Sequence, residues 1–373
     1  DAAPEALERA RTAIERILET ARTKGRLSED DVAARRKCLE LGGDLPLLAA
    51  SDIVVEAVFE SLELKRAIFA ELDQWCAPSA VLATNTSTLD VDAIAAAASH
   101  PERSLGMHFF SPAHVMRLLE IVRGAETSAA TLATAIALGK RLGKVPVVVG
   151  NCDGFVGNRM LLKYRREAEF LVLAGATPEQ VDGALVAFGF AMGPFAVADL
   201  AGIDVGVRAK EERRKRGTVL AFALTNLSDE LVAAGRLGQK TGAGYYRYEP
   251  GERTAHPDPA LAPFIARERE RLGITLRTVD DTEIVERCVY ALANEGARIL
   301  AEGIASSAAD IDTIWVNGYG FPAARGGPMR HALDTGLPRV AEAIRRFAQS
   351  DPGAWDPAAL ESLDAKTTLD QRE

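Results

Sequence analysis

One histidine and one glutamate stand twelve positions apart in the apolar stretch "GMHFFSPAHVMRLLEIV", residues 106–122. The run "GMHFF" is typical of a strand, the residues around Pro112 favour a turn, and "RLLEIV" is typical of a returning strand. Counting six residues each way from His114 sets His108 opposite Glu120. A carboxylate that faces an imidazole holds one tautomer and strengthens it as a general base near neutral pH. A histidine that is merely packed and hydrogen-bonded is the alternative, which this geometry alone leaves open.

Further polar segments adjoin predicted strand ends. "NTSTL" places Ser87 at the carboxyl edge of a sheet, where ligands bind, although a serine there is also a typical helix cap. "DGFVGNRML" places Asn158 at a helix start, where its amide can either hydrogen-bond a substrate carbonyl or cap the helix. "VFESLELK" places Glu60 at a strand end and Lys65 in the following turns, where a surface ion pair is the alternative.

The elements that must position these residues alternate along the first 150 residues. Strands are predicted over 51–60, 80–89, 104–110, 116–122 and 145–150, and helices over 3–23, 30–40, 64–76, 91–98 and 131–143. Alternation of helices with short buried strands implies a parallel sheet with helical crossovers. The expected fold class is α/β, with a Rossmann-type doubly wound domain over residues 1–150.

The rest of the chain has helical patterns and an internal repeat. "RMLLKYRREAEFLVLAG" aligns with "RCVYALANEGARILAEG", which sets Arg159 on Arg287, Glu167 on Glu295 and Gly175 on Gly303. We therefore expect two all-α domains, over 151–248 and 278–373, joined by a linker and connecting helix over 249–277. The basic stretch "KEERRKRG", residues 210–217, is predicted to lie on a solvated helix face.

The two copies differ at one position that matters for chemistry. The first copy has Asn158 where the second has Glu286. If Asn158 has a chemical role, only the first copy can perform it. The second copy is therefore expected to be structural and non-catalytic.

Composition excludes several classes of function. The net charge of −9 over 373 residues argues against a general binder of nucleic acid or anionic membranes. The four cysteines form no CxxC pair or Cys/His cluster, so neither a zinc site nor a disulfide framework is expected. The sequence has no apolar stretch of the roughly 18 residues that suggest a membrane-spanning helix. With its alanine and arginine content, the chain is predicted to be a cytoplasmic bacterial protein.

Eight motifs occur in the order found in one known family. "VVEAVFE", "NTSTL", "GMHFFSP", "LLEIV", "DGFVGNR", "MGPFAVADLAG", "GQKTGAGYY" and "GYGFPAARGGPM" resemble the L-3-hydroxyacyl-CoA dehydrogenases, especially the dehydrogenase half of multifunctional fatty-acid oxidation enzymes. Each motif is weak alone, but the order and spacing together are specific and extend over nearly the whole chain. The family oxidises the 3-hydroxyl of L-3-hydroxyacyl-CoA to a ketone in β-oxidation and passes a hydride to NAD.

The resemblance implies a role for each matching position. His108 matches the catalytic base, which removes the hydroxyl proton as hydride leaves C3, and Glu120 matches the carboxylate that orients it. Ser87 matches a serine that contacts the reacting oxygen beside the nicotinamide. Asn158 matches an asparagine that binds the substrate. The implied contacts with NAD are Asp1, Val58, Phe59, Glu60, Lys65, Ser87 and Ser111, with Lys240 as a weaker candidate.

The amino-terminal segment departs from the family pattern. The family's first strand and its GxGxxG turn, which meets the pyrophosphate at a helix start, have no counterpart in this sequence. "DAAPEAL" resembles the segment after the second strand, which sets Asp1 on the acid that binds the adenosine ribose. If Asp1 is the true terminus, a sheet edge is exposed. We therefore expect a truncated Rossmann domain from a longer polypeptide with an enoyl-CoA hydratase half, and a possible thiolase subunit as partner.

The leading hypothesis is an NAD-dependent L-3-hydroxyacyl-CoA dehydrogenase, with an acyl-CoA substrate. In this interpretation the second helical copy covers a surface that a dimer partner covers in single-copy relatives. One alternative is a stand-alone 3-hydroxybutyryl-CoA dehydrogenase. Another is an inactive assembly module, because loss of the phosphate-binding turn weakens NAD binding.

Overall fold

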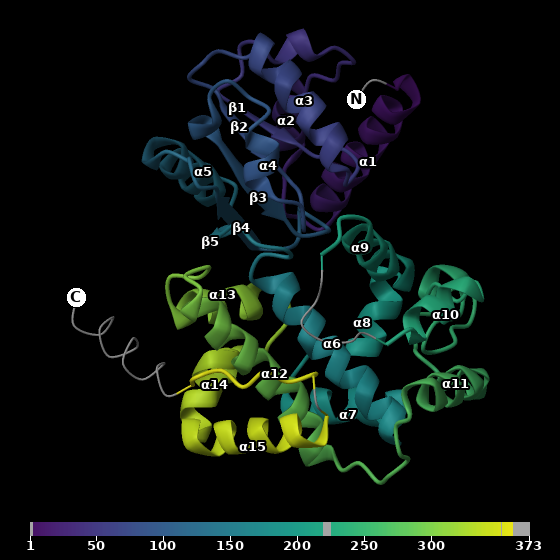
Figure 1. Cartoon of the computed structure of the whole chain (residues 1–373). Coiled ribbons are helices and arrows are strands. Elements are labelled where there is room, and N and C mark those ends of the chain that lie inside the picture. The colour runs from purple at the N-terminus through teal and green to yellow at the C-terminus, as the bar shows by residue number, and fades with distance from the viewer. Residues whose placement is uncertain (1–2, 219–224, 352, 361–373) are drawn as a thin grey trace.

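The computed structural model describes residues 3–218, 225–351 and 353–360. Its strands are β1 (Ile53–Glu56), β2 (Val81–Thr84), β3 (Ser104–Phe109), β4 (Leu118–Arg123) and β5 (Val145–Gly150). Its α-helices are α1 (Pro4–Thr23), α2 (Glu29–Lys37), α3 (Leu62–Trp75), α4 (Val91–Ala95), α5 (Ala129–Arg141), α6 (Gly157–Ala174), α7 (Pro178–Phe188), α8 (Pro194–Ala201), α9 (Ile203–Lys215), α10 (Leu227–Ala233), α11 (Ala262–Leu272), α12 (Asp281–Ala301), α13 (Ala308–Gly318), α14 (Pro328–Thr335) and α15 (Leu337–Ser350). Figure 1 shows a sheet-containing part followed by a helical part that begins with α6.

The described strands form one sheet in the order β1-β2-β3-β4-β5. β1, β2 and β3 are parallel, β4 is antiparallel to β3, and β5 is parallel to β4. The expected parallel arrangement is confirmed for the other pairings, and the antiparallel β3–β4 pairing is the returning strand that the turn around Pro112 predicts. Residues 110–117 are too few for a crossover helix, so the chain returns as a hairpin.

Helices cover both faces of this sheet. Leu82 on one face packs with Phe69 of α3, whereas Met107 on the other face packs in the cluster that contains Ala135 of α5. The β4 and β5 side chains on the first face join the core of the helical part. The carboxyl ends of β1, β2 and β3 therefore lie where the sheet meets the helical part.

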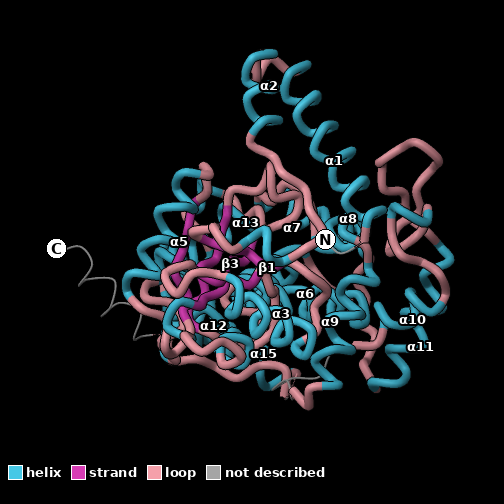
Figure 2. The backbone as a smooth tube through the Cα atoms, turned by 90° about the horizontal axis from the view of Figure 1, so that it is seen from above, coloured by secondary structure: helices cyan, strands magenta, loops and turns pink. Residues whose placement is uncertain are grey.

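Two features lie at the β1 side of the sheet. β1 is an edge strand, and it ends earlier than the predicted 51–60 because the Glu56 carboxylate accepts a hydrogen bond from the Val58 N–H at 2.6 Å and turns the chain. Before it, α1 and α2 form a helical hairpin that projects from the rest of the molecule (Figure 2). Arg36 and Glu15 pair across this hairpin at 2.6 Å.

The predicted repeat is visible in the helical part. α6, α7 and α8 recur as α12, α13 and α14, and in each set a buried aspartate of the second helix binds the start of the third. Asp182 accepts the N–H groups of Phe195 and Ala196 at 3.0 and 2.9 Å. Asp312 accepts the two N–H groups at the start of α14, at 2.7 and 3.0 Å. The equivalent helices therefore have equivalent internal contacts.

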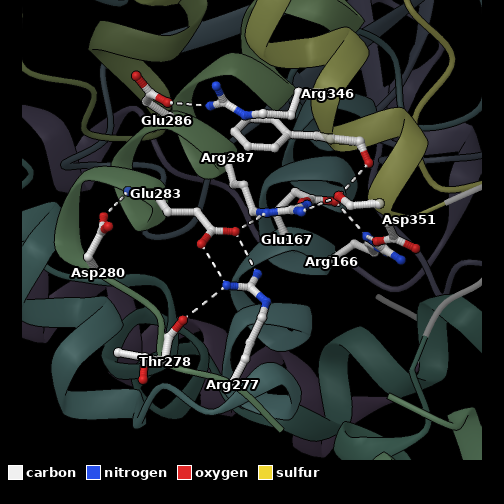
Figure 3. A network of polar contacts seen from close by, with 12 residues as sticks. Arg166, Glu167, Arg277, Thr278, Asp280, Glu283, Glu286, Arg287, Arg346 and Asp351 are labelled. Atoms are coloured by element: carbon white, nitrogen blue, oxygen red, sulfur yellow. Dashed lines mark hydrogen bonds and ion pairs between the residues drawn. The ribbon is translucent and has the colours of Figure 1, made fainter. Parts of the chain in front are cut away.

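The two copies pair through the residues that the alignment matches. Arg159 of α6 binds Glu295 of α12 at 2.7 Å, and Arg287 of α12 binds Glu167 of α6 at 2.9 Å. Each arginine thus binds the glutamate of the other copy, which is the reciprocal pattern of a two-fold interface. Figure 3 shows the second pair inside a larger ionic network that joins α6, α12 and the chain after α15.

Candidate active site

The β3–β4 hairpin places His108 opposite Glu120, as the residue count predicts. His108 Nδ1 lies 2.8 Å from Glu120 Oε2, and the two residues are 6% and 0% exposed. We assign the proton of this bond to Nδ1, because the buried carboxylate is an acceptor. The other ring nitrogen, Nε2, makes no hydrogen bond to the described residues and keeps its lone pair available for a proton.

Both oxygens of Glu120 have partners. Oε1 accepts the backbone N–H of Gly157, the first residue of α6, at 2.9 Å. The positive end of the helix dipole therefore also faces this carboxylate. The rings of Phe110 and Phe155 lie 4.4 and 5.8 Å from the His108 ring and exclude water from its sides.

Ser87 lies in a loop that is bound by Glu60. Glu60 Oε1 accepts the hydroxyl of Thr86 at 2.6 Å and the backbone N–H and hydroxyl of Ser87 at 2.8 and 3.2 Å. Burial alone raises the pKa of Glu60, but these hydrogen bonds and the charge of Lys65 together hold it below its usual value. The helix-cap alternative for Ser87 is wrong, because Asp90 caps α4.

Asn158, the second residue of α6, reaches the same place. Its Nδ2 donates to the carbonyl oxygen of Ser87 at 3.4 Å, and its Oδ1 accepts from the hydroxyl of Tyr319 at 3.0 Å. The capping alternative is wrong here too, because α6 has Val156 at its N-cap and no side-chain capping bond. Sequence reasoning missed Tyr319, although it lies in the quoted motif "GYGFPAARGGPM" between two glycines.

The residues expected to contact NAD lie in different environments. Val58 and Phe59 are exposed, at 38% and 86%, beyond the end of β1. Lys65 is buried and binds Glu56 Oε1 at 2.8 Å and Glu60 Oε2 at 3.5 Å, so the ion pair suggested as an alternative is present, but its lysine is not on the surface. Lys65 is buried because the buried carboxylate of Glu56 and the half-buried carboxylate of Glu60 require a cation beside them.

Two other candidates, Ser111 and Lys240, lie outside this cluster. Ser111 is exposed in the turn after β3. Lys240 forms an ion pair with Asp204 at the start of α9. Asp1 lies outside the described residues.

Two cavities adjoin the site. One of about 260 Å³ runs from Ser87 and Asn158 between α6, α8 and α9, where Leu161 and Val205 supply apolar walls. The other, of about 1220 Å³, is a groove along the end of β1, lined by residues that include Val58. Ser87 and Asn158 line the first cavity only.

The prediction that residues 210–217 form a solvated helix face is wrong for two arginines. Arg213 is buried, and its Nε binds Asp153 Oδ2 at 2.5 Å. Arg216 binds Asp153 Oδ1 at 3.1 Å and the carbonyl oxygen of Thr88 at 3.1 Å. Because Thr88 follows Ser87, these contacts tie the end of α9 to the loop that carries Ser87. A single basic run does not reveal partners so distant in the chain.

Over the described ranges, no group of three or more His, Cys, Asp or Glu side chains is arranged to hold a metal ion. The four cysteines are free. None of the described helices combines the length and the apolar character that crossing a membrane requires.

Two family models match the chain. One, described as "3-hydroxyacyl-CoA dehydrogenase, NAD binding domain", matches residues 1–152. The other, described as "3-hydroxyacyl-CoA dehydrogenase, C-terminal domain", matches residues 154–248 and 284–371.

Individual relatives agree with these matches. The peroxisomal bifunctional enzyme of Danio rerio is 47% identical over 358 residues, which cover 90% of this chain and 49% of that protein. The crystal structure of 3-hydroxybutyryl-CoA dehydrogenase from Escherichia coli K12 has a TM-score of 0.84 at 28% identity, over 99% of this chain and 93% of that one. The dehydrogenase part of multifunctional enzyme 1 from C. elegans has a TM-score of 0.65 at 30% identity, over 95% and 81%. The chain spans about half the length of the curated relatives it matches.

The relatives contradict the expected bacterial cytoplasmic location. Those with high identity are named as peroxisomal or glyoxysomal enzymes of animals and plants. The prediction is wrong because unpaired cysteines and a high alanine and arginine content do not distinguish a bacterial cytoplasm from a peroxisome.

Proposed function

Because this chain belongs to the 3-hydroxyacyl-CoA dehydrogenase family, we propose that it oxidises L-3-hydroxyacyl-CoA to 3-ketoacyl-CoA with NAD in fatty-acid β-oxidation. The buried pair of His108 and Glu120, at 2.8 Å, is the observation that carries the proposal. Oxidation of an alcohol by hydride loss needs a base that takes the hydroxyl proton. His108 supplies that base, with Nε2 unbonded to the described residues.

The proton path follows from the two imidazole nitrogens. Nε2 of His108 takes the proton of the substrate 3-hydroxyl, and the ring becomes an imidazolium. Glu120, bonded to Nδ1, then compensates this positive charge inside the protein. The N–H of Gly157 keeps the carboxylate in place through its second oxygen. In the reverse direction His108 returns the proton to the oxygen that is reduced.

The substrate oxygen requires donors as well as a base. Ser87 and Asn158 lie together at the smaller cavity, where the Asn158 Nδ2 is available to bind the 3-oxygen or the thioester carbonyl. The Ser87 hydroxyl donates to Glu60 and must turn from it to donate to the substrate. Leu161 and Val205 suit the acyl chain, and Arg165 and Lys210 line the same cavity. In this proposal the smaller cavity receives the acyl-CoA.

The groove at the end of β1 fits a dinucleotide. It follows the parallel edge strand β1 to its carboxyl end, and Val58 and Phe59 line it with exposed apolar surface suited to a flat ring. NAD, when bound, accepts the hydride that leaves C3. Glu60 contributes here by holding the Ser87 loop, and Lys65 by neutralising the carboxylates around it.

The test is consumption of NADH with acetoacetyl-CoA by the unchanged chain, by His108→Gln and by a control, His100→Gln. His100 is an exposed histidine beside Glu102. We expect His108→Gln to lower kcat on the order of 100-fold or more, since that is what a general base contributes. The control is expected to keep full activity. No turnover by the unchanged chain would favour the inactive assembly module instead.

A second candidate is a stand-alone 3-hydroxybutyryl-CoA dehydrogenase. The structural similarity to the Escherichia coli enzyme of that name, over 99% of this chain, favours it. Comparison of kcat/KM across acyl chain lengths separates the two functions. The β-oxidation function predicts activity maintained on medium and long chains, whereas the second candidate predicts a steep fall beyond four carbons.

The larger assembly is also part of the proposal. Bifunctional and multifunctional relatives are about twice as long as this chain, which supports a longer polypeptide with an enoyl-CoA hydratase half. A thiolase subunit is the partner that would consume the 3-ketoacyl-CoA product. Co-purification of the full-length protein with thiolase activity tests this partner.

A further inference from the structure

Tyr319 joins the second helical copy to the candidate active site. It follows α13 directly, and its hydroxyl donates to Asn158 Oδ1 at 3.0 Å. We propose that Tyr319 is a positioning residue that sets the side-chain amide of Asn158 for substrate binding, so that the second copy takes part in the function of the first. This inference rests on the proposed function, because it assumes that Asn158 binds the acyl-CoA substrate.

The sequence around Tyr319 explains how it reaches the site. At Gly318 an added Cβ would lie 2.3 Å from a methyl group of Leu118, so only glycine lets the end of α13 approach β4 this closely. Gly320 has φ of +73°, a left-handed conformation that favours glycine and turns the chain away. The two glycines of "GYG" therefore leave the tyrosine as the one side chain of this turn that points into the site.

Aromatic contacts then fix the ring. Tyr319 stacks on Trp315, with ring centroids 4.8 Å apart, and meets Phe110 edge-on at 5.5 Å. Phe110 in turn lies 4.4 Å from the His108 ring. Tyr319 thus completes an aromatic wall that continues from the proposed base to the second copy.

The first residues of α6 provide the space for this ring. A Cβ at Gly157 would lie 2.4 Å from the Tyr319 hydroxyl oxygen. The same Gly157 donates its N–H to Glu120. The tyrosine therefore packs on the peptide that binds Glu120 and hydrogen-bonds the next side chain in the helix.

The hydrogen bond determines which end of the Asn158 amide faces the substrate. Burial, and the nearby charge of Glu120, raise the pKa of Tyr319, so its hydroxyl keeps its proton and donates. Since Oδ1 accepts this hydrogen bond, the Nδ2 group must point the other way, where it meets the Ser87 carbonyl oxygen at 3.4 Å. Nδ2 then has a second hydrogen for an acceptor on the substrate. Without Tyr319 the amide is free to rotate and present Oδ1 to a substrate carbonyl, which repels it.

The test is a double-mutant cycle on the full chain with Tyr319→Phe, Asn158→Ala and both together. Phenylalanine keeps the ring contacts and removes only the hydroxyl. The control is Tyr290→Phe, since Tyr290 is a buried tyrosine of α12 outside the site. The dissociation constant of acetoacetyl-CoA is measured by calorimetry, and kcat and KM are measured with NADH.

We expect Tyr319→Phe to weaken acetoacetyl-CoA binding about 3- to 10-fold, the range for one hydrogen bond. It should weaken binding no further in the Asn158→Ala background, because the amide that it orients is then absent. Tyr290→Phe should leave both constants unchanged, and all folded variants should keep the melting temperature of the unchanged chain within a few degrees.

Equal losses in both backgrounds would overturn the proposal, since Tyr319 would then act independently of Asn158. A Tyr319→Phe variant that binds as tightly as the unchanged chain would overturn it too. The proposed function fails by a different result, namely binding of acetoacetyl-CoA without any NADH consumption, and the cycle of dissociation constants still decides the role of Tyr319 in that case. Absence of all acetoacetyl-CoA binding contradicts both.

Discussion

At the scale of single residues, the buried charge of Glu120 has three contacts that stabilise it. His108 Nδ1 and the Gly157 N–H bind its two oxygens, and the α6 dipole points at it. A buried carboxylate without such partners is costly. The arrangement therefore favours a histidine that gains a proton during the reaction.

The residue-scale prediction concerns Glu120→Gln. Glutamine keeps the shape of the side chain, so the hairpin should stay folded, but it removes the charge that compensates the imidazolium. We expect kcat to fall on the order of 100-fold, with a much smaller change in KM. Steady-state kinetics at neutral pH measure this effect. Retention of more than half of kcat would contradict the role of Glu120.

Some of these residues could be predicted from sequence and others could not. His108 and Glu120 share one hairpin, so counting along two strands was sufficient to pair them. Tyr319 and Asn158 are 161 residues apart, and no periodicity links them. The expectation that Glu60 contacts the cofactor stays a prediction, and its hydrogen bonds to the Ser87 loop were not foreseen. Side-chain partners that come from different elements depend on the packing of the whole chain.

At the scale of elements, the start of α6 organises the site. Its first residue binds Glu120 and its second carries the amide that meets Ser87. The turn before it uses Gly154 at φ +77° and Phe155 at φ +49°, an uncommon conformation for a residue with a side chain. The motif "DGFVGNR" therefore determines where α6 begins, and this position places both the N–H group that binds Glu120 and the amide that meets Ser87.

The element-scale prediction compares Gly157→Ala with Gly183→Ala. A Cβ at Gly157 would lie 2.3 to 2.6 Å from three atoms of Tyr319, whereas one at Gly183 in α7 meets nothing within 4 Å. We expect Gly157→Ala to lower the free energy of unfolding by about 1–3 kcal/mol and to lower kcat, because α6 must shift. Gly183→Ala should raise stability by about 0.5–1 kcal/mol, as in other helix interiors. Urea unfolding measures the free energy of unfolding of both variants. Equal changes in the two variants would contradict the close packing of Tyr319 on α6.

The strands too could be predicted only in part from the sequence. The periodic patterns located all five strands of the described sheet. The turn residues around Pro112 also gave the reversal at β4. The patterns did not give the end of β1, which depends on the Glu56 side chain. Periodic patterns and turn residues therefore locate an element and its neighbour in a hairpin, whereas the exact end of a strand depends on side-chain contacts.

At the scale of the whole molecule, the two helical copies form an internal pair with reciprocal ion pairs. We propose the division into residues 1–150, 151–248, 249–277 and 278–373, with the second copy as the internal counterpart of a dimer partner. Arg287 is almost fully buried between the copies, and its guanidinium also lies over the rings of Phe170 and Phe347 at 4.7 and 4.4 Å. The interface between the two copies thus contains a buried guanidinium, which is stable there only while it stays paired with the carboxylate of Glu167.

The prediction for this interface is that Arg287→Met destabilises the chain strongly. Glu167 keeps Arg166 as a partner at 2.7 Å, so we expect the low end of the range for breaking a buried pair, about 3 kcal/mol. The control is Arg330→Met, which removes an exposed pair with Asp334 at the same 2.9 Å and should have little effect. Thermal or urea unfolding compares the two, and similar effects would contradict a structural role for the buried network.

The repeated aspartates predict a pH dependence of stability. Burial raises the pKa of Asp312 to about 7, although the N–H groups of Met329 and Arg330 act in the opposite direction. An aspartate in an unfolded chain titrates at about 4. The folded state therefore holds this proton more tightly, and the free energy of unfolding falls as the pH rises from about 4 to about 7.

Asp312→Asn removes this titration. The variant should be less stable than the unchanged chain at about pH 5, because one amide oxygen replaces two acceptors. The difference in the free energy of unfolding between the two proteins should narrow at about pH 8, where the unchanged chain has an ionised Asp312. Urea unfolding at both pH values measures this difference, and a difference that widens with pH would contradict the raised pKa.

The most direct measurement follows a deuterium atom from NADH that carries deuterium at both hydrogen positions of nicotinamide C4 into the product formed from acetoacetyl-CoA. The proposed function predicts one deuterium on C3 of 3-hydroxybutyryl-CoA, seen by mass spectrometry, with the unchanged chain, and a rate of labelling on the order of 100-fold lower with His108→Gln. Absence of label from the product of the unchanged chain, or equal labelling rates for the two proteins, would contradict hydride transfer that depends on His108.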